Sequence, residues 1–583
     1  MTIREAIRVA IEEAVQEIGG EQAAPSFSVE VPPPTKKIGG GVPENREYGD
    51  YATNAALVLA KVLKRSTMEV AGELVKKLAD ERWEVSVANP GFLNFRLAHS
   101  VARKFIGEIL EKKELFGRNS VLAGKKVIVE YTDPNPFKEF HIGHLMSNTI
   151  GESISRIVEF SGAEVKRVNY QGDVGIHVAK AVWAMKEQYD TDSWQVIENE
   201  YDVWAKGKWM GFLYAGGSSM YDNDQEKHDE IIEINKKIYD RSDPFINELY
   251  DKGREWSLEY FEEIYKRFGT KFDEYFFESE TGERGRELVE EGLLKGIFEK
   301  SDGAVVFRGE KYGLHTRVFI NSTGLPTYEA KELGLAVMKY ERYPYDLAFV
   351  VTGNEIVEYF KVVKAALREL RLELTERITH IPHGMLRLKG GKMSSRTGDV
   401  IRALDVLREA KGVIKGKIKD EMNFSDEQKE EISEQVALGA LKYSILHQSV
   451  GKDIIFDFET SLSFDGDSGP YLQYTYARAK SILRKAGIKG SIDKGMALNE
   501  YVVHVERELL HFPDAVAEAL QKRDPHFIAH YLFNLAQKFN TFYGNERILE
   551  DKIDVYKLAI TEAVAITLKN GLNLLGIEAP EEM

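Results

Sequence analysis

The sequence predicts an α/β nucleotide-binding domain of the Rossmann type, built on a parallel sheet, with a small α+β domain before it and an all-α helical bundle after it. Residues 127–131 form a short apolar β-branched run, and after a loop the apolar residues up to Gly162 recur at helical spacing. A second β-prone run, 165–170, completes a strand–helix–strand unit. From residue 401 onward no strand pattern is evident and helical segments follow one another. These changes of pattern predict domains at 1–110, 120–400 and 401–583.

The composition limits the classes of protein to be considered. A chain of 583 residues is too long for one hydrophobic core and suggests roughly three to four domains. The absence of cysteine excludes disulfides, thiolate catalysis and cysteine-ligated zinc, and no structural metal is implied. The first 20 residues have the pattern of an amphipathic helix rather than a targeting signal, and no apolar run is long enough to span a membrane. We therefore expect a soluble, cytoplasmic protein.

The first domain, residues 1–110, is expected to combine helices with a few strands. An opening helix is followed by a loop rich in proline and glycine, by the segment 49–54 and by a helix rich in alanine and leucine. A turn at Pro90-Gly91 then precedes an alternating strand. In this domain Asp50, Tyr51 and Asn54 fit a helix cap and a core aromatic more readily than a contact site.

The loop after the first strand of the central domain carries the clearest chemical signal. It ends in His141-Ile142-Gly143-His144, at the start of the next helix. The two histidines would share one helix face at its amino-terminal end, where partial positive charge and free N–H groups favour phosphate. Gly143 would let a ligand approach the backbone. The alternative, two ordinary histidines near a helix start, is disfavoured because the pattern is rare by chance.

The rest of the central domain predicts a second half-fold. Gly172 and Asp173 follow the second strand in a loop that could line a ligand crevice or simply make a turn. Residues 187–300 are charged, dotted with tyrosine and tryptophan and mostly helical, so we interpret them as an insertion. The alternation resumes at 316–320, continues through a helix at 328–335 and reaches a strand at 347–351 with Gly353 and Glu355 at its tip.

A glycine- and lysine-rich span at 388–399 follows the last strand of the central domain. It contains three glycines, two lysines, an arginine and three hydroxyl side chains. Glycines permit close backbone approach, and the cations supply charge for β- and γ-phosphates, so the span suits a polyphosphate clamp. A solvated hairpin tip explains the same composition equally well.

The helical region after residue 401 contains two basic patches. The net charge of −16 argues against nonspecific nucleic-acid binding, but an acidic protein of this size can still carry one basic face. The patches are Lys411, Lys415, Lys417 and Lys419, and then Arg478, Lys480, Arg484, Lys485 and Lys489 beside Tyr471, Tyr474 and Tyr476. Cations interleaved with aromatic rings suit RNA, although charged helix faces are more often only solvated.

Together these features resemble a class I aminoacyl-tRNA synthetase. The histidine motif, the Lys392-Met393-Ser394-Ser395 segment after the last strand and the helical tail occur in the order of that family. More narrowly, the chain resembles the arginyl-tRNA synthetases, because the resemblance covers essentially the whole chain. The matching segments are 49–54, 90–94, 135–144, 172–173, 393–398, 469–474, 477–478 and the closing 574–580.

The resemblance implies ATP-dependent activation of L-arginine, with Mg²⁺, and transfer of the arginyl group to the 3′-terminal adenosine of tRNA-Arg. The implied catalytic residues are His141, His144, Lys138 and Lys392. The implied ATP contacts are Gly143, Gly172, Asp173, Gly353, Glu355, Met393, Ser394 and Ser395. The implied arginine contacts are Glu130, Asn135, His144, Tyr328 and Glu332. The implied tRNA contacts are Asp50, Tyr51, Asn54, Tyr471, Gln473, Tyr474, Arg478, Lys480 and Arg484.

The resemblance also implies a monomer whose first domain touches the corner of the tRNA, whose helical domain binds the anticodon, and whose arginine activation requires bound tRNA. Three positions depart from the family pattern. Glu332 stands where the family usually has Asp, Ile356 where it often has Gln, and Ser395 where class I enzymes have a second lysine. In arginyl enzymes with the last change, a lysine just ahead of the histidine motif supplies the missing charge, and here that residue is Lys138. The alternatives are a small-substrate adenylyltransferase of the same fold and a paralogue with an RNA-binding or regulatory role.

Overall fold

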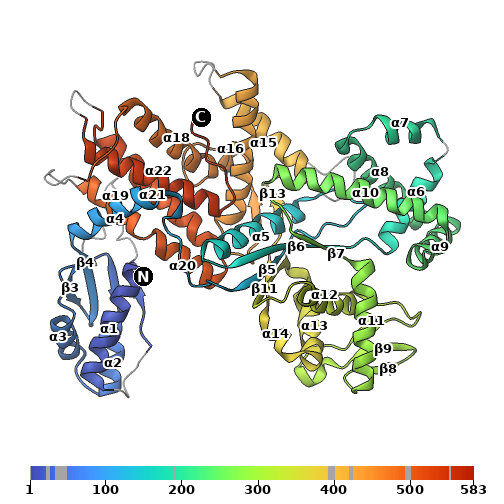
Figure 1. Ribbon diagram of the computed structural model, residues 1–583, viewed down its shortest axis with the longest axis horizontal. Helices are drawn as coiled ribbons and strands as arrows, with labels where there is room; N and C mark the ends of the chain where they lie inside the picture. Colours follow the sequence, from blue (N-terminus) through green and yellow to red (C-terminus); the bar gives the residue numbers. More distant parts are fainter. Residues whose placement is uncertain are drawn as a thin grey trace.

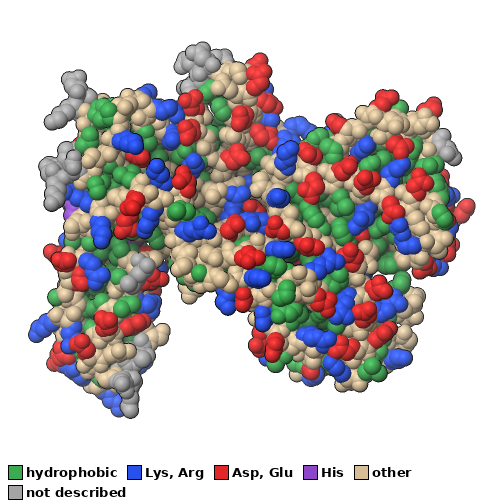
Figure 2. Space-filling view, in the orientation of Figure 1, with side chains coloured by type: hydrophobic (Ala, Val, Ile, Leu, Met, Phe, Trp, Pro, Cys, Tyr) green, Lys and Arg blue, Asp and Glu red, His purple; other side chains and the backbone are tan. Residues whose placement is uncertain are grey.

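The structure is a computed structural model, and it describes residues 2–20, 26–32, 49–189, 191–390, 401–418, 424–492, 500–549 and 553–583. In Figure 1 the α+β unit lies at the lower left, a helical bundle lies above it, and the central sheet connects the bundle to two lobes on the right. Acidic and basic side chains are interspersed over the face of the molecule seen in Figure 2. None of the helices in the described ranges is both long enough and apolar enough to cross a bilayer.

The amino-terminal unit is a four-stranded antiparallel sheet with helices on it, in the strand order β1-β2-β4-β3. Its elements are α1 (Ile3–Gly19), β1 (Val29–Glu30), β2 (Tyr51–Thr53), α2 (Ala55–Leu63), α3 (Thr67–Lys77), β3 (Trp83–Ala88) and β4 (Phe92–Leu97). A capping box fixes the start of α1, because Glu5 N–H donates to Thr2 Oγ1 at 3.1 Å and Thr2 N–H donates to Glu5 Oε2 at 2.6 Å.

The next helix, α4 (His99–Lys112), leaves this unit and packs on two helices of the bundle, α19 (Glu500–Leu510) and α22 (Val555–Leu574). The short turn η1 (Lys113–Leu115) follows α4, and Asn570 Nδ2 of α22 donates to Lys113 O at 2.8 Å and to Phe116 O at 3.1 Å. Helix α4, which ends close to the boundary predicted at residue 110, thus joins the α+β unit to the bundle, and its Ala102 still belongs to the core of that unit.

The central sheet has five parallel strands in the order β12-β11-β5-β6-β7. They are β5 (Lys126–Glu130), β6 (Glu164–Gln171), β7 (Glu274–Phe277), β11 (Leu347–Gly353) and β12 (Ile378–His383). From β5 the chain adds β6 and β7 on one side, and it later returns to add β11 and β12 on the other. Ligands of such sheets bind at the carboxyl ends of the strands where this direction changes, here between β5 and β11.

Helices cover both faces of the sheet. Val127 and Val129 pack on the side of α5 (Ile142–Phe160), whereas Ile128 packs on the side of α11–α13, as the two-residue period of a strand requires. The elements on this second side are α11 (Glu278–Leu294), β8 (Glu299–Ser301), β9 (Ala304–Phe307), η2 (Gly309–Tyr312), β10 (Arg317–Ile320), α12 (Tyr328–Arg342), η3 (Asn354–Ile356), α13 (Val357–Leu370) and α14 (Leu372–Arg377). Strands β8, β9 and β10 form a separate small sheet.

The segment predicted as a helical insertion contains one strand of the central sheet. The helices are α6 (Ile176–Gln188), α7 (Asp192–Glu200), α8 (Val203–Asn223), α9 (Gln225–Asp240) and α10 (Pro244–Arg267), and α6–α10 pack around a core of their own that includes Trp194 and Trp256. Strand β7 follows them inside the 187–300 region. It has only four residues at the sheet edge, too few for its two-residue period to stand out among charged neighbours.

The carboxyl-terminal region is a bundle of helices tied to the central domain by a short strand pair. Its elements are β13 (Leu386–Leu388), α15 (Ala403–Lys417), α16 (Asp426–Leu446), β14 (Ile454–Phe456), α17 (Phe458–Ser461), α18 (Gly469–Ala486), α20 (Phe512–Lys522) and α21 (His526–Asn545), with α19 and α22. Strands β13 and β14 pair in parallel, so the prediction that no strand follows residue 401 is wrong for the three residues of β14. Buried Lys442 of α16 donates to Phe268 O at 2.7 Å and to Gly576 O, just beyond the ends of α10 and α22.

Candidate active site

The loop between β5 and α5 lies at the crevice in a strained and well-anchored conformation. Thr132, Asp133 and Phe137 have φ angles of 83°, 45° and 68°, in the left-handed region that side chains disfavour. Thr132 N–H donates to Ser147 Oγ at 3.0 Å, and Phe137 N–H donates to Ser257 Oγ at 2.9 Å. Strain of this kind persists only where neighbouring contacts impose it, and it is concentrated at functional sites.

His141 and His144 form a stacked pair at the start of α5, with ring centres 3.5 Å apart. His141 Nδ1 accepts from Gly143 N–H at 3.1 Å and from His144 N–H at 3.3 Å, and His141 N–H donates to His144 Nδ1 at 3.3 Å. Because both Nδ1 atoms accept backbone protons, each neutral ring carries its own proton on Nε2.

The charge state of this pair follows from its surroundings. Burial and the Lys138 ammonium lower the pKa of His141 to about 4. Burial, His141 and Lys138 hold the pKa of His144 well below its ordinary value. Near neutral pH both rings are therefore uncharged Nε2–H donors, a state that suits polarisation of a phosphate oxygen without a proton exchange.

Two charged side chains precede the histidines and connect them to the helical insertion. Lys138 Nζ lies 4.8 Å from the centre of the Tyr214 ring on α8. Glu139 and Arg402 form an ion pair at 2.6 Å, and a Cβ atom on Gly211 of α8 would approach Glu139 Cγ to 2.4 Å. Helix α8 therefore packs directly on this loop and keeps the Lys138 charge close to the histidines.

Four predicted site residues, Lys392, Met393, Ser394 and Ser395, lie outside the described residues. The chain that follows them is paired with the histidine loop. Ile142 N–H donates to Ile401 O at 3.0 Å, Ala403 N–H donates to Phe140 O at 3.1 Å, and His141 forms an antiparallel bridge with Arg402. The segment after residue 400 is thus fixed next to a motif about 250 residues earlier in the chain.

A buried ion pair lies where β5 ends. Glu130, the last residue of β5, pairs with Lys339 of α12, and the two side chains are 2% and 1% exposed. Glu130 was predicted from the resemblance to bind arginine; in the structure a lysine occupies at least one of its oxygens. Sequence reasoning missed Lys339, although it lies seven residues after Glu332 and therefore on the same face of the helix.

Two more carboxylates lie beside this ion pair. Glu332 accepts a hydrogen bond from Tyr359 OH at 3.3 Å, and Asp133 accepts one from Tyr170 N–H at 2.8 Å. Burial and the charge of Glu130 raise the pKa of Glu332 to about 7 and also raise the pKa of Asp133 well above its ordinary value. Three carboxyl groups thus share one lysine, and burial together with the repulsion from Glu130 favours the protonated forms of Glu332 and Asp133.

Another part of the site wall lies around Gly172. A Cβ atom there would be 2.3 Å from Asn135 Oδ1 and 3.2 Å from Glu278 Oε1, so only glycine allows these side chains to close on the backbone. Glu278 pairs with Lys331 at 2.7 Å. Tyr328, with 64% of its surface exposed, lies with its ring centre 5.3 Å from Lys331 Nζ. Glu278 was missed because it follows β7, the strand that the sequence did not reveal.

Asp173, whose predicted contact with ATP stays a prediction, is buried at the end of β6. Its side chain has no exposed surface, and its oxygens accept hydrogen bonds from Tyr250 OH at 3.0 Å, Arg254 Nε at 3.1 Å, Ser279 N–H at 2.9 Å and Ser279 Oγ at 2.8 Å. Asp173 thus anchors α10 and α11 to the end of β6.

Gly353 and Glu355, also predicted to contact ATP, lie at the end of β11 and in the turn that follows it. A Cβ atom on Gly353 would approach Glu355 Oε2 to 2.2 Å. The glycine therefore lets the Glu355 carboxylate fold back over the end of the strand.

Asp50 and Tyr51 form part of the contact between the amino-terminal unit and the bundle. Tyr51 has no exposed surface and donates to Asp514 Oδ2 at 2.7 Å, while Asp50 pairs with Arg507 at 3.2 Å. These contacts give both side chains a structural role, and their predicted contact with tRNA stays a prediction. Asn54 Oδ1 accepts from Ser28 N–H at 2.9 Å and so links two segments of the same unit.

The predicted contacts in the bundle divide into buried and accessible residues. Gln473 has no exposed surface and donates to Gln435 O at 3.1 Å and Glu578 O at 2.8 Å, so it links α18 to α16 and to the last residues of the chain. Its predicted contact with tRNA stays a prediction. Tyr471 is half-buried, and its hydroxyl accepts from Asn540 Nδ2 at 3.0 Å.

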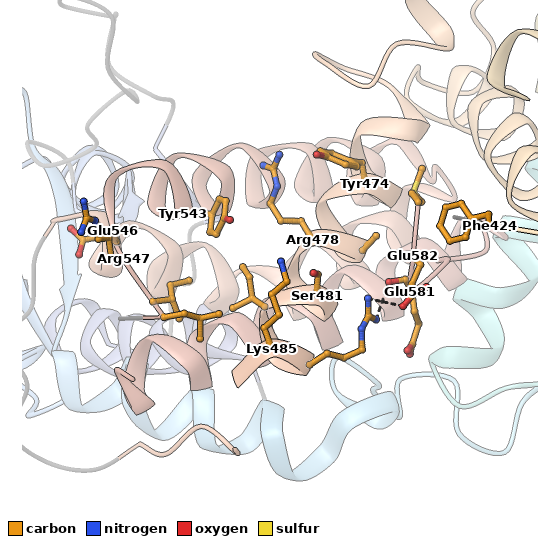
Figure 3. A pocket seen from close by; sticks show the side chains of 16 residues that line it. Phe424, Tyr474, Arg478, Ser481, Lys485, Tyr543, Glu546, Arg547, Glu581 and Glu582 are labelled. Atoms are coloured by element: carbon orange, nitrogen blue, oxygen red, sulfur yellow. Dashed lines mark hydrogen bonds and ion pairs between the residues drawn. The ribbon is translucent and has the colours of Figure 1, made fainter. Parts of the chain in front are cut away.

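The accessible predicted residues lie around a cavity of about 660 Å³ among α18, α21 and the last residues of the chain (Figure 3). Arg478 lies between two rings, 4.7 Å from the centre of Tyr474 and 5.3 Å from that of Tyr543. At its rim Arg484 pairs with Glu582 at 3.0 Å. Lys480, on the same helix, pairs with Glu581 at 2.9 Å. Stacked aromatic and guanidinium planes around a cavity suit unstacked bases.

Comparison with known proteins gives the same assignment over the whole chain. Residues 105–458 match the catalytic domain of class I tRNA synthetases (R), residues 472–583 match the DALR anticodon binding domain, and residues 1–97 match the arginyl tRNA synthetase N terminal domain.

Individual relatives and solved structures agree. The arginine–tRNA ligase of Clostridium acetobutylicum is 32% identical over 93% of this chain and 95% of its own length, and that of Treponema denticola is 31% identical over 93% and 94%. The solved arginyl-tRNA synthetase of Thermus thermophilus superposes with a TM-score of 0.80 over 100% of both chains at 27% identity. This chain belongs to the arginyl-tRNA synthetase family of class I.

Proposed function

We propose that this chain is an arginine–tRNA ligase, which activates L-arginine with ATP and transfers it to the 3′-terminal adenosine of tRNA-Arg. One observation carries the proposal: a neutral histidine pair and a cluster of carboxyl groups lie at the same crevice of the central sheet. The histidines lie at the amino end of α5, where phosphate is favoured, and the carboxylates lie where β5 and α12 meet. Family membership and the relatives named above support the same activity.

In the first step the arginine carboxylate attacks the α-phosphate of ATP in line, and pyrophosphate leaves. Little covalent help is needed, so catalysis depends on positioning and on stabilisation of charge. The Nε2–H groups of His141 and His144 donate to the α-phosphate oxygens as negative charge grows there. Lys138 adds a full positive charge on the same side. Lys392 holds the departing pyrophosphate, and Mg²⁺ enters bound mainly to phosphate oxygens and water, as this ion usually does.

Arginine carries a guanidinium and an ammonium group, and both need anionic partners. Glu332 and Tyr328 receive the guanidinium, and Asn135 meets the backbone groups of the amino acid. The ATP moiety lies along Gly143, Gly172, Gly353 and Glu355, on the open edge between β5 and β11.

For tRNA, the cavity lined by Arg478, Tyr474 and Tyr543 receives anticodon bases, and the amino-terminal unit contacts the corner of the molecule. The enzyme acts as a cytoplasmic monomer, and tRNA is required for arginine activation. Arginine-dependent pyrophosphate exchange with and without tRNA tests this last point, because equal exchange in both would remove the requirement.

The decisive experiment is aminoacylation of total tRNA with each of the twenty amino acids in turn. Charging with arginine alone is the expected result. Charging with a different amino acid would reassign the specificity, and no charging with any amino acid would favour the small-substrate or RNA-binding alternative.

A further inference from the structure

A cavity of about 310 Å³ lies where the central domain meets the bundle, and the proposed reaction does not involve it. Its walls are formed by α5, α10, α16 and α22 and by residues 576–579, which follow α22. Among the described residues that line it, one side chain is a carboxylate, Glu578, and four are cationic: Arg156, Arg267, Lys442 and Lys569. This is a local excess of positive charge in a chain whose net charge is −16. An excess of cations around a cavity favours an anionic ligand.

The two arginines of this cavity are held in place by ion pairs. Arg156 Nε pairs with Glu152 at 2.7 Å, and Arg267 donates to Glu434 through Nε at 2.5 Å and through Nη2 at 3.0 Å. The Nη1 group of Arg267 has no hydrogen-bond partner among the described residues. Arg267 is thus fixed in position with N–H donors left for a ligand.

Lys442 is a buried cation without a carboxylate partner. It is 5% exposed, and it forms no ion pair within the described part of the chain. Its ammonium group donates to Phe268 O at 2.7 Å and to Gly576 O, which uses two of its three N–H bonds. Burial, and then the charge of Arg156, lower the pKa of Lys442 to about 8, so most of this lysine is still charged near neutral pH.

The two carbonyl groups do not balance this charge. They lie just beyond the carboxyl ends of α10 and α22, where the helices provide only partial negative charge. A buried ion without a full counter-charge is costly, and an anion in the cavity would supply that charge.

Two exposed residues of opposite charge complete the lining. Lys569 of α22 forms no ion pair with any residue in the described ranges, and Glu578 acts on Lys442 through its charge. The cavity volume is at the lower end of the range usual for small-ligand sites. Residues 576–579 line this cavity and residues 581–583 line the cavity of Figure 3, so the closing segment of the chain connects the two.

We propose that this cavity is an anion site that binds a phosphate group through Arg267, Lys442 and Lys569. These three cations come from three different helices. A phosphate group carries up to two negative charges and offers three or more acceptor oxygens, whereas a carboxylate carries one charge and offers two oxygens. The phosphate is either free in solution or part of the tRNA backbone, and the same side chains bind both.

The test measures binding of inorganic phosphate to the full-length protein without tRNA, by phosphorus-31 NMR at constant ionic strength. Lys569→Ala should weaken the binding about two- to fivefold, and Glu578→Gln should strengthen it by about the same factor, because exposed charges contribute in this range. Lys442→Met should weaken it about 10- to 100-fold through loss of a charged donor. The control Lys300→Ala, on β8 of the separate small sheet, should leave the affinity unchanged.

The two exposed positions keep the test decisive even if Lys442→Met does not fold, because a loss of structure does not produce opposite effects at residues 569 and 578. The proposal is overturned if the wild-type protein binds no phosphate, or if Lys569→Ala and Glu578→Gln both bind it as Lys300→Ala does. It is also overturned if Lys138→Ala weakens the binding and Lys569→Ala does not, because the phosphate then binds at the histidine pair.

Repeating the titration with saturating tRNA-Arg separates the two sources of phosphate. Displacement of the bound phosphate by tRNA would assign the cavity to a phosphate of the tRNA backbone. Unchanged binding in the presence of tRNA would assign it to free phosphate. Either result supports the anion site.

Discussion

The affinity for arginine should depend on pH through Glu332. Burial and the Glu130 charge raise the pKa of this carboxyl group to about 7, against the opposing effects of Lys339 and Tyr359. An acid with a raised pKa is protonated below that value and ionised above it, and only the ionised form pairs with guanidinium. The ionised fraction rises from about one-tenth at pH 6 to about nine-tenths at pH 8. We therefore expect kcat/KM for arginine to rise about tenfold over this interval.

The histidines of the site do not titrate in the same window. Burial, with Lys138 as the second cause, lowers the pKa of His141 to about 4, and burial, His141 and Lys138 lower the pKa of His144 well below its ordinary value. His141 is therefore neutral from pH 6 to pH 8, and the lowered pKa of His144 favours its neutral form as well. The rise in kcat/KM therefore reports a carboxyl group, either Glu332 or Asp133, whose pKa is also raised.

Pyrophosphate exchange at saturating ATP, Mg²⁺ and tRNA, measured from pH 5.5 to 8.5, tests this assignment. Glu332→Gln removes the ionisable group and should flatten the profile, with a loss at pH 8 of about 10- to 100-fold in kcat/KM. Glu332→Asp should keep the rise. If Glu332→Gln retains the same tenfold rise, Glu332 is not the group that titrates, and Asp133→Asn becomes the variant expected to flatten it.

Three more changes test other parts of the structure. Lys138→Ala should slow arginine activation by roughly 10²-fold or more through loss of a charge near the α-phosphate, and unchanged single-turnover adenylate formation would refute that role. Lys485→Ala, in the cavity of Figure 3, should weaken tRNA binding and should lower the slope of log K against log salt concentration by about one phosphate contact. The control variant Lys300→Ala should leave both unchanged. Equal slopes for the two variants would mean that the tRNA binds elsewhere. Tyr51→Phe should lower the free energy of unfolding by about 1–3 kcal/mol, because Asp514 loses a buried hydrogen-bond donor. Denaturant unfolding measures this change, and the kinetics of pyrophosphate exchange should stay the same. A change in the KM for arginine would contradict a purely structural role.

The elements that the sequence predicted best are those with strong periodicity. Strand β5 and helix α5 were expected from their apolar spacing, and both lie where the strand–loop–helix pattern placed them. Strands β7 and β14 were missed, because three or four residues do not show a period and their pairing partners lie far away in sequence. Whether such short segments form strands depends on their pairing with distant segments, and a local sequence pattern does not show that pairing.

The same distinction applies to the site. The histidine motif is local, so its position at the start of α5 followed from a few adjacent residues. Asp173, Tyr51 and Gln473 are also in recognisable motifs, but each is buried and bonded to a residue 38 or more positions away. A motif residue that is needed for the fold has the same local signature as one that binds a ligand. A structural residue and a ligand-binding residue can be distinguished only by their contacts in the three-dimensional structure.

The site as a whole has opposite polarity at its two ends, and this polarity orients the substrate. On the acidic side the carboxyl groups of Glu130, Asp133 and Glu332 outnumber the single Lys339, which would favour the cationic groups of arginine there in the proposed reaction. On the other side, Lys138 and the two Nε2–H donors attract anions, and there the α-phosphate of ATP lies in the proposed reaction. In the proposed reaction the carboxylate of arginine would be repelled by one side and attracted by the other, and would so be directed toward the phosphorus that it attacks. Much of the orientation required for in-line transfer thus follows from where the fold buries its charges.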